Sequence, residues 1–332
     1  MVLAHVTDAW TRDADRHDER YFTAVFVNGL AAPMFMLLAG VALAMAAESR
    51  ARSIGAPAAA RSVRRRGWQV FGLAFLFRAQ SQLLGWGPLV NFLKVDILNV
   101  MGLTMVGTAW AWGIAPSRAV RIWMYAGATV FFAMLNPVVR DLPWLAVVPD
   151  PLEWYIRPTA GRAAFSVFPW AGFLTAGALA GELIDAARGP GQERRLHLGL
   201  AATALAGVTT SYLLSFLPSI YTTSEFWSTS PVFFFIRLGL VTAAIPLAWA
   251  VGLSWQPLVA MGRSSLFVYW IHVEMVYGSW AVLLRRRLPW ELTVVCALAL
   301  CVLLYRLVLL KNSWLARRPL PARLGFLAPV LR

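Results

Sequence analysis

The feature that most constrains this chain is a series of apolar stretches, each about 20 residues long, separated by short polar or arginine-rich segments. A helix needs about 20 residues to cross the hydrocarbon core of a bilayer, whereas a membrane-spanning strand alternates apolar and polar residues over roughly 10 positions. The stretches show no such alternation. They therefore predict an all-α fold, a polytopic bundle of transmembrane helices that forms a single domain over residues 1–332.

Nine full spans are predicted, together with the end of a tenth helix at the N-terminus. The pentapeptide Met1–His5 is apolar but too short to cross a bilayer, and it lacks the basic region of a secretory signal. We interpret it as the outer end of a helix that begins upstream of Met1, which would place both ends of the complete protein in the cytoplasm. The nine full spans are Phe22–Ala47, Gly67–Trp86, Leu93–Trp112, Ala119–Val139, Ala164–Ala186, His197–Leu217, Pro231–Gly252, Val259–Leu284 and Pro289–Leu310.

The charges are distributed as in a membrane protein and not as in a nucleic-acid-binding protein. Only 14% of the residues are charged and 59% are hydrophobic, whereas soluble domains carry roughly 25% charged residues. The net charge is +14, but the arginines cluster in short loops, as the positive-inside bias predicts. We therefore predict that the arginine-rich loop between the first two spans lies in the cytoplasm. The predicted location of the protein is the inner membrane of the cell. One cluster disagrees, because Arg285 to Arg287 then fall on the outer face.

The cysteines and glycines predict no metal site and a tight helix contact. Cys296 and Cys301 lie five residues apart in one apolar run, a spacing that fits no zinc motif, so we expect no bound metal. Gly172, Gly177 and Gly181 form a small-residue face that allows close helix packing. Such a face allows two helices to pack closely, either within one chain or between the two chains of a homodimer.

The eighth span carries the best candidate for chemistry. An ionisable group inside a bilayer costs roughly 2.5–3.5 kcal/mol on insertion scales, so each one is a functional candidate. Ser265, Tyr269 and His272 are spaced i, i+4 and i+7, which places them on one helix face. At a rise of about 1.5 Å per residue, His272 lies about 20 Å from the start of the span, near mid-membrane. A neutral imidazole there can accept a proton. The alternative is a packing histidine bonded to a neighbouring carbonyl.

The N-terminal helix end carries a second candidate pair, His5 and Asp8, at i and i+3. A carboxylate one turn away can fix the tautomer of an imidazole and raise its basicity, which is the arrangement of a general base. The alternative is an ordinary polar helix end at the outer surface.

On the cytoplasmic side, Arg64, Arg65 and Arg66 can hold the phosphates of a cofactor, although anionic lipid headgroups are the commoner target of such clusters.

Segments along nearly the whole chain, in the same order, resemble a known family. They are similar to the heparan-α-glucosaminide N-acetyltransferase-like proteins, which belong to a wider superfamily of transmembrane acyltransferases that includes the acyltransferase-3 proteins. The family's Asp-x-x-Arg-Gly opening is absent, in agreement with a first helix that begins upstream, and its outer-loop histidine has only an approximate counterpart in His17. The similar segments are His5–Asp8, Gly29–Gly40, Val95–Leu103, Phe168–Phe173 with Gly177 and Gly181, Ser230–Phe234 and Gly262–Glu274.

The resemblance implies acyl transfer across a membrane. A cytoplasmic acyl-CoA, in the simplest case acetyl-CoA, would donate its acyl group to a hydroxyl or amine, usually of a sugar or another small acceptor, on the outer side. The family's polar position on the first helix corresponds to His5, and its Tyr-x-x-His-x-Glu element corresponds to Tyr269, His272 and Glu274.

The roles predicted on this basis are those of an acyltransferase. His5, held by Asp8, would remove a proton from the acceptor as the acceptor attacks the thioester. His272, with Tyr269, would position or stabilise the tetrahedral oxyanion. An acyl-histidine intermediate is equally compatible with these residues. The CoA phosphates would be held by Arg64, Arg65, Arg66 and Arg263.

Two other classes of function fit the same sequence. In a transporter or flippase the buried polar groups would line a path and no covalent bond would change, although such proteins often show internal repeats and this chain shows none. A non-catalytic membrane protein that keeps the fold is the third interpretation. The acyl group, the acceptor and the oligomeric state are not determined by the sequence.

Overall fold

The structure is a computed structural model that describes residues 1–85, 89–317 and 330, and the regular elements within these residues are all helices. The predicted all-α fold is confirmed. The chain divides into two compact units, which are described separately. The terminal unit comprises Met1–Ala31, Phe77–Leu89 and Leu253–Arg332, and the central unit comprises Ala32–Leu76 and Val90–Gly252. A single domain over residues 1–332 stays a prediction.

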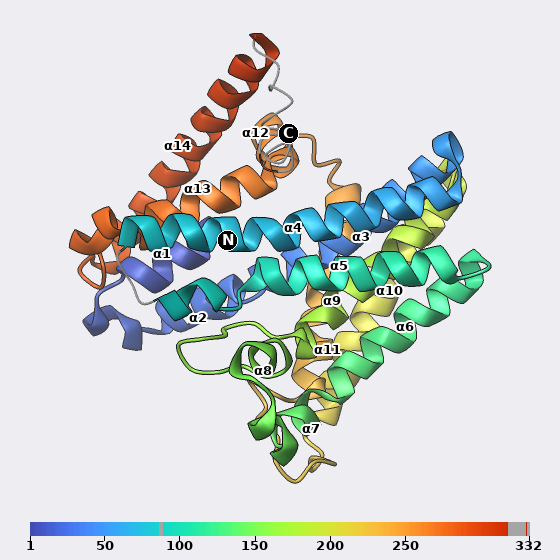
Figure 1. Cartoon of the computed structure of the whole chain (residues 1–332), viewed down its shortest axis with the longest axis horizontal. Coiled ribbons are helices and arrows are strands. Elements are labelled where there is room, and N and C mark those ends of the chain that lie inside the picture. Colours follow the sequence, from blue (N-terminus) through green and yellow to red (C-terminus); the bar gives the residue numbers. More distant parts are fainter. Residues whose placement is uncertain (86–88, 318–329, 331–332) are drawn as a thin grey trace. The chain divides into compact units, whose positions relative to one another are not determined.

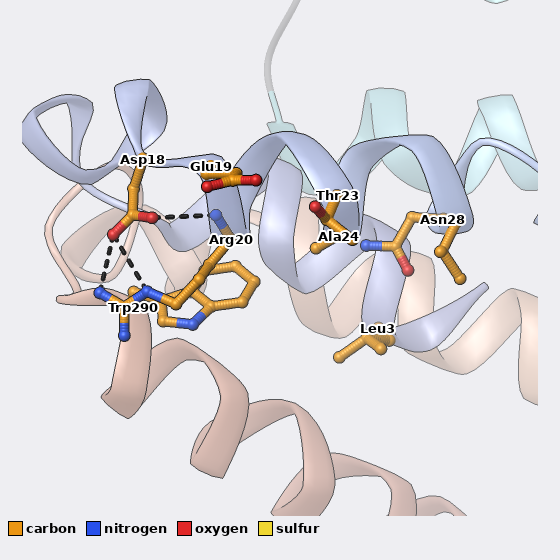
Figure 2. A pocket seen from close by; sticks show the side chains of 9 residues that line it. Leu3, Asp18, Glu19, Arg20, Thr23, Ala24, Asn28 and Trp290 are labelled. Atoms are coloured by element: carbon orange, nitrogen blue, oxygen red, sulfur yellow. Dashed lines mark hydrogen bonds and ion pairs between the residues drawn. The ribbon is translucent and has the colours of Figure 1, made fainter.

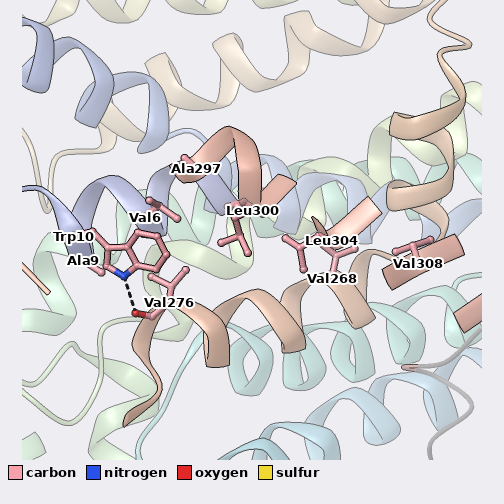
Figure 3. Packing of buried hydrophobic residues seen from close by; sticks show 10 residues of the cluster. Val6, Ala9, Trp10, Val268, Val276, Ala297, Leu300, Leu304 and Val308 are labelled. Atoms are coloured by element: carbon pink, nitrogen blue, oxygen red, sulfur yellow. Dashed lines mark hydrogen bonds between the residues drawn. The ribbon is translucent and has the colours of Figure 1, made fainter. Parts of the chain in front are cut away.

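In the terminal unit, three helices share one apolar cluster: α1 (Val2–Trp10), α13 (Ser265–Tyr277) and α14 (Trp290–Arg317). Figure 3 shows Val6 and Trp10 of α1 facing Val276 of α13, with Leu300 and Leu304 of α14 in the same cluster. The indole Nε1 of Trp10 donates a hydrogen bond of 3.1 Å to the carbonyl of Val276. Inside a bilayer such contacts stabilise the association of helices through close van der Waals packing. The cluster therefore fixes α1 against α13.

The loop that precedes α14 is held against the end of α1. The backbone N–H of Arg286 donates to the carbonyl of Ala9, and that of Leu288 donates to the carbonyl of Trp10. The side chain of Asp15 accepts a hydrogen bond of 2.8 Å from the backbone N–H of Trp290, at the first residue of α14, and this bond holds the pKa of Asp15 below its usual value. A carboxylate at a helix N-terminus also stabilises the helix through its dipole. Hydrogen bonds thus hold this loop to the end of α1 and to Asp15.

The remaining elements of the terminal unit are shorter. The 3₁₀ helix Asp13–His17 leads into α2 (Glu19–Asn28), whose first turn is capped by the side chain of Asp18. Near the C-terminal end of the chain, α12 (Gln256–Arg263) precedes α13, and the 3₁₀ helix Ser279–Leu283 follows it. α4 (Ala56–Gly85) runs from the central unit into the terminal unit.

In the central unit, long helices pack in pairs, with α6 against α9 and α10 against α11 (Figure 1). α5 begins at a capping box, in which the Asp96 side chain accepts from the backbone of Leu98 and the Asn99 side chain accepts from the backbone of Asp96. Three short helices follow α6 and precede α9: α7 (Asn136–Arg140), the 3₁₀ helix Pro143–Val147 and α8 (Asp150–Ile156). The long helices are α3 (Ala31–Ile54), α5 (Ile97–Ile114), α6 (Arg118–Met134), α9 (Val167–Ala186), α10 (Pro190–Leu214) and α11 (Pro231–Ala250).

Two of the three predicted glycines of α9, Gly177 and Gly181, pack against α3 of the same chain, whereas Gly172 faces Phe234 of α11. A Cβ atom built on Gly177 would overlap the carbonyl oxygen of Leu37, and one built on Gly40 would overlap the carbonyl oxygen of Leu174. The two backbones approach each other because neither position carries a side chain. The glycines thus serve packing within the chain, and a homodimer stays a prediction.

Substitution of Gly177 by alanine is expected to destabilise the central unit by at least about 1–3 kcal/mol, because the added methyl group has to push α3 away from α9. The matched control is Gly207→Ala in α10, where a Cβ atom meets nothing within 4 Å. That change is expected to be neutral or to stabilise by up to about 1 kcal/mol, the difference in helix propensity. Thermal melting of the purified protein in detergent measures both, and equal melting temperatures for the two variants would contradict the packing described here.

Six segments in the described part of the chain are long and apolar enough to cross a membrane. Each of the nine predicted spans overlaps a helix, but the number nine, with the end of a tenth, is not confirmed. The end of the second predicted span, Trp86, lies outside the described residues. The six segments are Glu19–Ile54, Ile97–Ile114, Val167–Ala186, Pro190–Leu214, Pro231–Ala250 and Trp290–Arg317.

The eighth predicted span is wrong as one continuous helix. α12 ends at Arg263 and α13 begins at Ser265, because Ser264 has a non-helical backbone (φ −105°, ψ 27°). The short side chain of Ser264 accepts a hydrogen bond of 2.8 Å from the buried ammonium group of Lys311 on α14. His272 consequently lies seven residues into α13, about 10 Å from its start and not about 20 Å.

Candidate active site

His272 lies in the interior of the terminal unit, with only 1% of its surface exposed. Its Nδ1 atom is 2.6 Å from the carbonyl oxygen of Val268, one turn earlier on α13. Since a carbonyl can only accept, Nδ1 carries the proton of the neutral ring, and the lone pair is on Nε2. Within the described residues Nε2 is buried and has no hydrogen-bond partner. Nδ1 of His272 is thus bonded to a neighbouring carbonyl, as in the packing alternative given above, whereas Nε2 has no hydrogen-bond partner among the described residues.

His5 lies directly beside His272, although the two residues are far apart in the sequence. Their ring centroids are 5.0 Å apart and the rings are tilted by 37°. The Nδ1 atom of His5 is also buried without a hydrogen-bond partner among the described residues. The structure thus brings together the two imidazoles that the sequence singled out separately, each with a buried nitrogen that has no hydrogen-bond partner among the described residues.

Tyr269 is adjacent to His272, as its spacing on α13 predicts. It is 5% exposed, and its ring meets that of His272 edge to face at a centroid distance of 5.7 Å. The end of α4 supports the same helix, because Gln80 accepts a hydrogen bond of 2.8 Å from Trp270 and Ser81 donates one of 2.7 Å to Glu274. Glu274, which the family resemblance singled out, is therefore held by a serine of α4.

The expected contact between Asp8 and His5 is the main difference from the sequence analysis. The carboxylate of Asp8 accepts a hydrogen bond of 3.0 Å from the hydroxyl of Tyr277, the last residue of α13. The ring of Tyr277 in turn meets His5 edge to face at 5.4 Å. Tyr277 therefore takes the position between Asp8 and His5. Sequence reasoning missed it because its spacing from His272 places it on no shared helix face.

A cavity of about 350 Å³ opens at this end of the terminal unit. It is lined by Asp8 and Ala9 of α1, Tyr277 of α13, and Arg285 and Arg286 of the following loop. The guanidinium of Arg285 donates to the backbone carbonyls of Tyr277 and Gly278. Two arginines of the cluster that disagrees with the predicted topology thus border a cavity whose lining includes Asp8 and Tyr277.

A second cavity, of about 620 Å³, lies beside α2 in the same unit. Figure 2 shows its mixed lining, with Trp290 next to the ion pair of Asp18 and Arg20, whose closest atoms are 2.7 Å apart, and Leu3 farther along the cavity below Asn28. Its lining contains neither histidine of the pair. The lining of the first cavity also contains neither histidine, but it includes Tyr277, whose ring contacts His5. We therefore assign the candidate chemistry to the two imidazoles that adjoin this lining residue.

The arginines predicted to hold the CoA phosphates are divided between the two units. Arg64, Arg65 and Arg66 are on the part of α4 that belongs to the central unit, where the guanidinium of Arg64 lies over the ring of Trp110 at 4.2 Å. Arg263 is the last residue of α12 in the terminal unit and is exposed. A shared binding site for all four stays a prediction.

An ion-pair cluster in the central unit was missed by the sequence analysis. Glu182 of α9 is fully buried and lies 2.7 Å from Arg121 and 3.2 Å from Arg118, both of α6. Glu48 of α3 lies 2.6 Å from Arg121. The partners are more than 60 residues apart in the sequence, so no local pattern could identify them. The cluster joins α3, α6 and α9, and its two arginines balance the charges of its two glutamates.

The comparisons with known proteins give one match. A family model described as heparan-alpha-glucosaminide N-acetyltransferase, catalytic, matches residues 1–217. The matched segment contains His5 and ends before α13, which carries His272. No curated protein and no solved structure matches the chain. A relation to the acyltransferase-3 proteins stays a prediction.

Proposed function

Since the chain belongs to the heparan-alpha-glucosaminide N-acetyltransferase catalytic family, a family of membrane acetyltransferases, we propose that it moves an acyl group, in the simplest case acetyl, from cytoplasmic acyl-CoA to a hydroxyl or amine on the outer side. The acceptor in this proposal is a sugar or another small molecule, and the membrane is the inner membrane of the cell. The observation that carries the proposal is the contact between the buried imidazole of His272 and the half-buried imidazole of His5, each with a buried nitrogen that has no hydrogen-bond partner in the described residues.

The hydrogen bond from Nδ1 to Val268 favours His272 as the base. A ring whose Nδ1–H is fixed by a carbonyl presents the Nε2 lone pair, which accepts a proton but cannot donate to an oxyanion until it has been protonated. We therefore exchange the two roles predicted from the sequence. His272 removes the acceptor's proton and then returns it to the departing CoA thiolate, and His5 and Tyr269 are placed to contact the tetrahedral intermediate.

A two-step path uses the same atoms. Nε2 of His272 attacks the thioester carbonyl, the C–S bond breaks, and the thiolate leaves as CoA while the acyl group stays on the imidazole. The acceptor then attacks the acyl-imidazole and restores the free ring. A second imidazole at 5.0 Å supplies a base for that step. In direct transfer Nε2 of His272 removes a proton, whereas in the acyl-histidine path it forms a covalent bond to the acyl group, so only the second path passes through an acylated protein.

The cytoplasmic part of the proposal rests on charge alone. Arg64, Arg65, Arg66 and Arg263 are the cationic side chains that would hold the phosphates of acyl-CoA. Arg65 and Arg263 are exposed, and Arg64 is partly exposed above Trp110. These exposures leave guanidinium groups accessible to a phosphate.

The experiment that tests the proposed function is transfer from radiolabelled acetyl-CoA by the purified protein in lipid nanodiscs, with glucosamine as the probe acceptor. We expect release of free CoA thiol, appearance of an acetylated sugar by mass spectrometry and, without acceptor, labelled protein if the acyl-histidine path operates. A transporter or flippase has no need to bind acetyl-CoA. Failure to bind the labelled compound, together with absence of an acetylated product, would therefore contradict the proposal and favour the transporter.

A further inference from the structure

The second cavity, beside α2, has a charged end and an uncharged end. At the charged end, the ion pair of Asp18 and Arg20 lies next to Trp290, and the cavity extends from there toward Leu3 (Figure 2). The side chains that line the rest of the cavity carry no charge: Leu3, Thr23, Ala24, Val27 and Asn28. A ligand that fills it therefore needs a charged head and a largely apolar body.

The charged end lies where two segments that can cross a membrane begin. These segments are Glu19–Ile54 and Trp290–Arg317. Their first turns are joined, because Nη1 of Arg20 lies 3.2 Å from the carboxylate of Glu291. Tryptophan is enriched at the membrane–water interface, and Trp290 lies at this end of the cavity. The charged end is thus expected at the level of the lipid headgroups, with the rest of the cavity in the hydrocarbon layer.

The helix that forms one wall of the cavity has the length of one leaflet. α2 has 10 residues and rises about 15 Å, which is half of a hydrocarbon core of roughly 30 Å. Its side chains Phe22, Val25 and Phe26 are exposed, as expected of a helix that faces lipid. Lipid acyl chains are therefore the apolar groups that a bilayer would supply along this cavity.

The charges at the headgroup level favour a ligand with an ammonium group. Two carboxylates, Asp18 and Glu19, line the cavity against one guanidinium, Arg20, so the lining carries a net charge of −1. Among the residues that the structure describes, Glu19 has no ion-pair partner. Asp18 and Glu291 accept from three of the five N–H groups of Arg20, which leaves two for a phosphate oxygen. A headgroup that carries both an ammonium and a phosphate matches these charges, and a purely anionic headgroup does not.

We propose that the second cavity binds one phospholipid with an ammonium-bearing headgroup, such as phosphatidylethanolamine. The lipid belongs to the leaflet at which α2 and α14 begin, the outer one in the predicted topology. Its ammonium group contacts Glu19, its phosphate contacts Arg20, and an acyl chain lies along Leu3 and Val27. This site is separate from the imidazole pair and does not depend on acyl transfer.

The charge part of the proposal is tested by native mass spectrometry of the purified chain in detergent, titrated with dioleoyl phosphatidylethanolamine or dioleoyl phosphatidylglycerol. We expect the ethanolamine lipid to bind at least about 5-fold more tightly, the effect of one charge near a membrane surface. Glu19→Gln is expected to remove most of this preference. Asp150→Asn, which removes an exposed carboxylate from the central unit, is the control and is expected to keep it.

The position of the lipid is tested with a pair of neighbouring substitutions on α2. Ala24→Phe places a ring in the cavity and is expected to weaken binding of the ethanolamine lipid at least about 10-fold. Val25→Phe adds a ring at the next position, which does not line the cavity, and is expected to leave binding unchanged. Melting temperatures show whether each variant is folded. Equal affinity of the parent protein for the two lipids, absence of bound lipid, or equal binding by the two phenylalanine variants overturns the proposal, whatever the outcome of the acetyl-transfer assay.

Discussion

Replacement of His272 by alanine is expected to lower the rate of acetyl transfer by about 10²–10⁴-fold, the usual contribution of a general base. The reason is specific to its geometry. The Nδ1–H of His272 is bound to Val268 and its Nε2 has no partner among the described residues. The substitution therefore removes the one nitrogen that is both buried and held in the basic tautomer. His5→Ala is expected to reduce the rate as well, because His5 is in direct contact with His272.

The measurement is acetyl-CoA turnover by purified variants in detergent or nanodiscs, with the melting temperature recorded for each. His17→Ala is the matched control, because His17 is an exposed histidine of the same unit. It is expected to change the rate by no more than about twofold, as surface substitutions usually do. Unchanged rates in both His272→Ala and His5→Ala, with intact melting, would end the assignment of the imidazoles to catalysis.

Loss of a single arginine from the central ion-pair cluster is the second large effect that we expect. Arg121→Leu removes the cation that lies 2.7 Å from Glu182 and 2.6 Å from Glu48. Glu182 is fully buried, so its carboxylate would lose a partner that water cannot replace. Breaking a buried ion pair on one side typically costs about 3–5 kcal/mol. Arg118 still lies 3.2 Å from Glu182 and 2.9 Å from Glu48, so we expect a loss near the lower end of that range.

Two comparisons make this second prediction specific. Arg188→Leu removes an arginine that is exposed and lies 3.4 Å from Asp185, and a surface pair of this kind is worth only about 0–1 kcal/mol. The double change Arg121→Leu with Glu182→Leu removes both buried charges and is expected to recover much of the loss, since apolar replacement of a buried pair is often neutral or stabilising. Equal melting temperatures for Arg121→Leu and Arg188→Leu in detergent would contradict this account.

The match over residues 1–217 and the geometry of α13 support the candidate site in different ways. The family match includes His5 and identifies the class of enzyme, but it ends before His272. The position of His272 beside His5 comes from the packing of α1, α13 and α14 around one apolar cluster. The family match thus supports the class of enzyme, and the roles of His5 and His272 stay predictions.

What the sequence by itself determined is the class of the molecule: a helical membrane protein with two histidines worth testing. Apolar stretch length is a local property, since each residue adds its own transfer free energy whatever it later contacts. For that reason the helices were predictable, and so was the placing of Ser265, Tyr269 and His272 on one face of α13.

Only the tertiary structure decided which side chains meet. The hydroxyl of Tyr277 reaches Asp8 across 269 positions of sequence, and the buried Glu182 finds Arg121 across 61. Such pairs depend on which helix faces pack together, and that is settled by the sum of many apolar contacts and not by any local pattern. The same reason explains why Asp8, one turn from His5, is bound by a tyrosine from another helix.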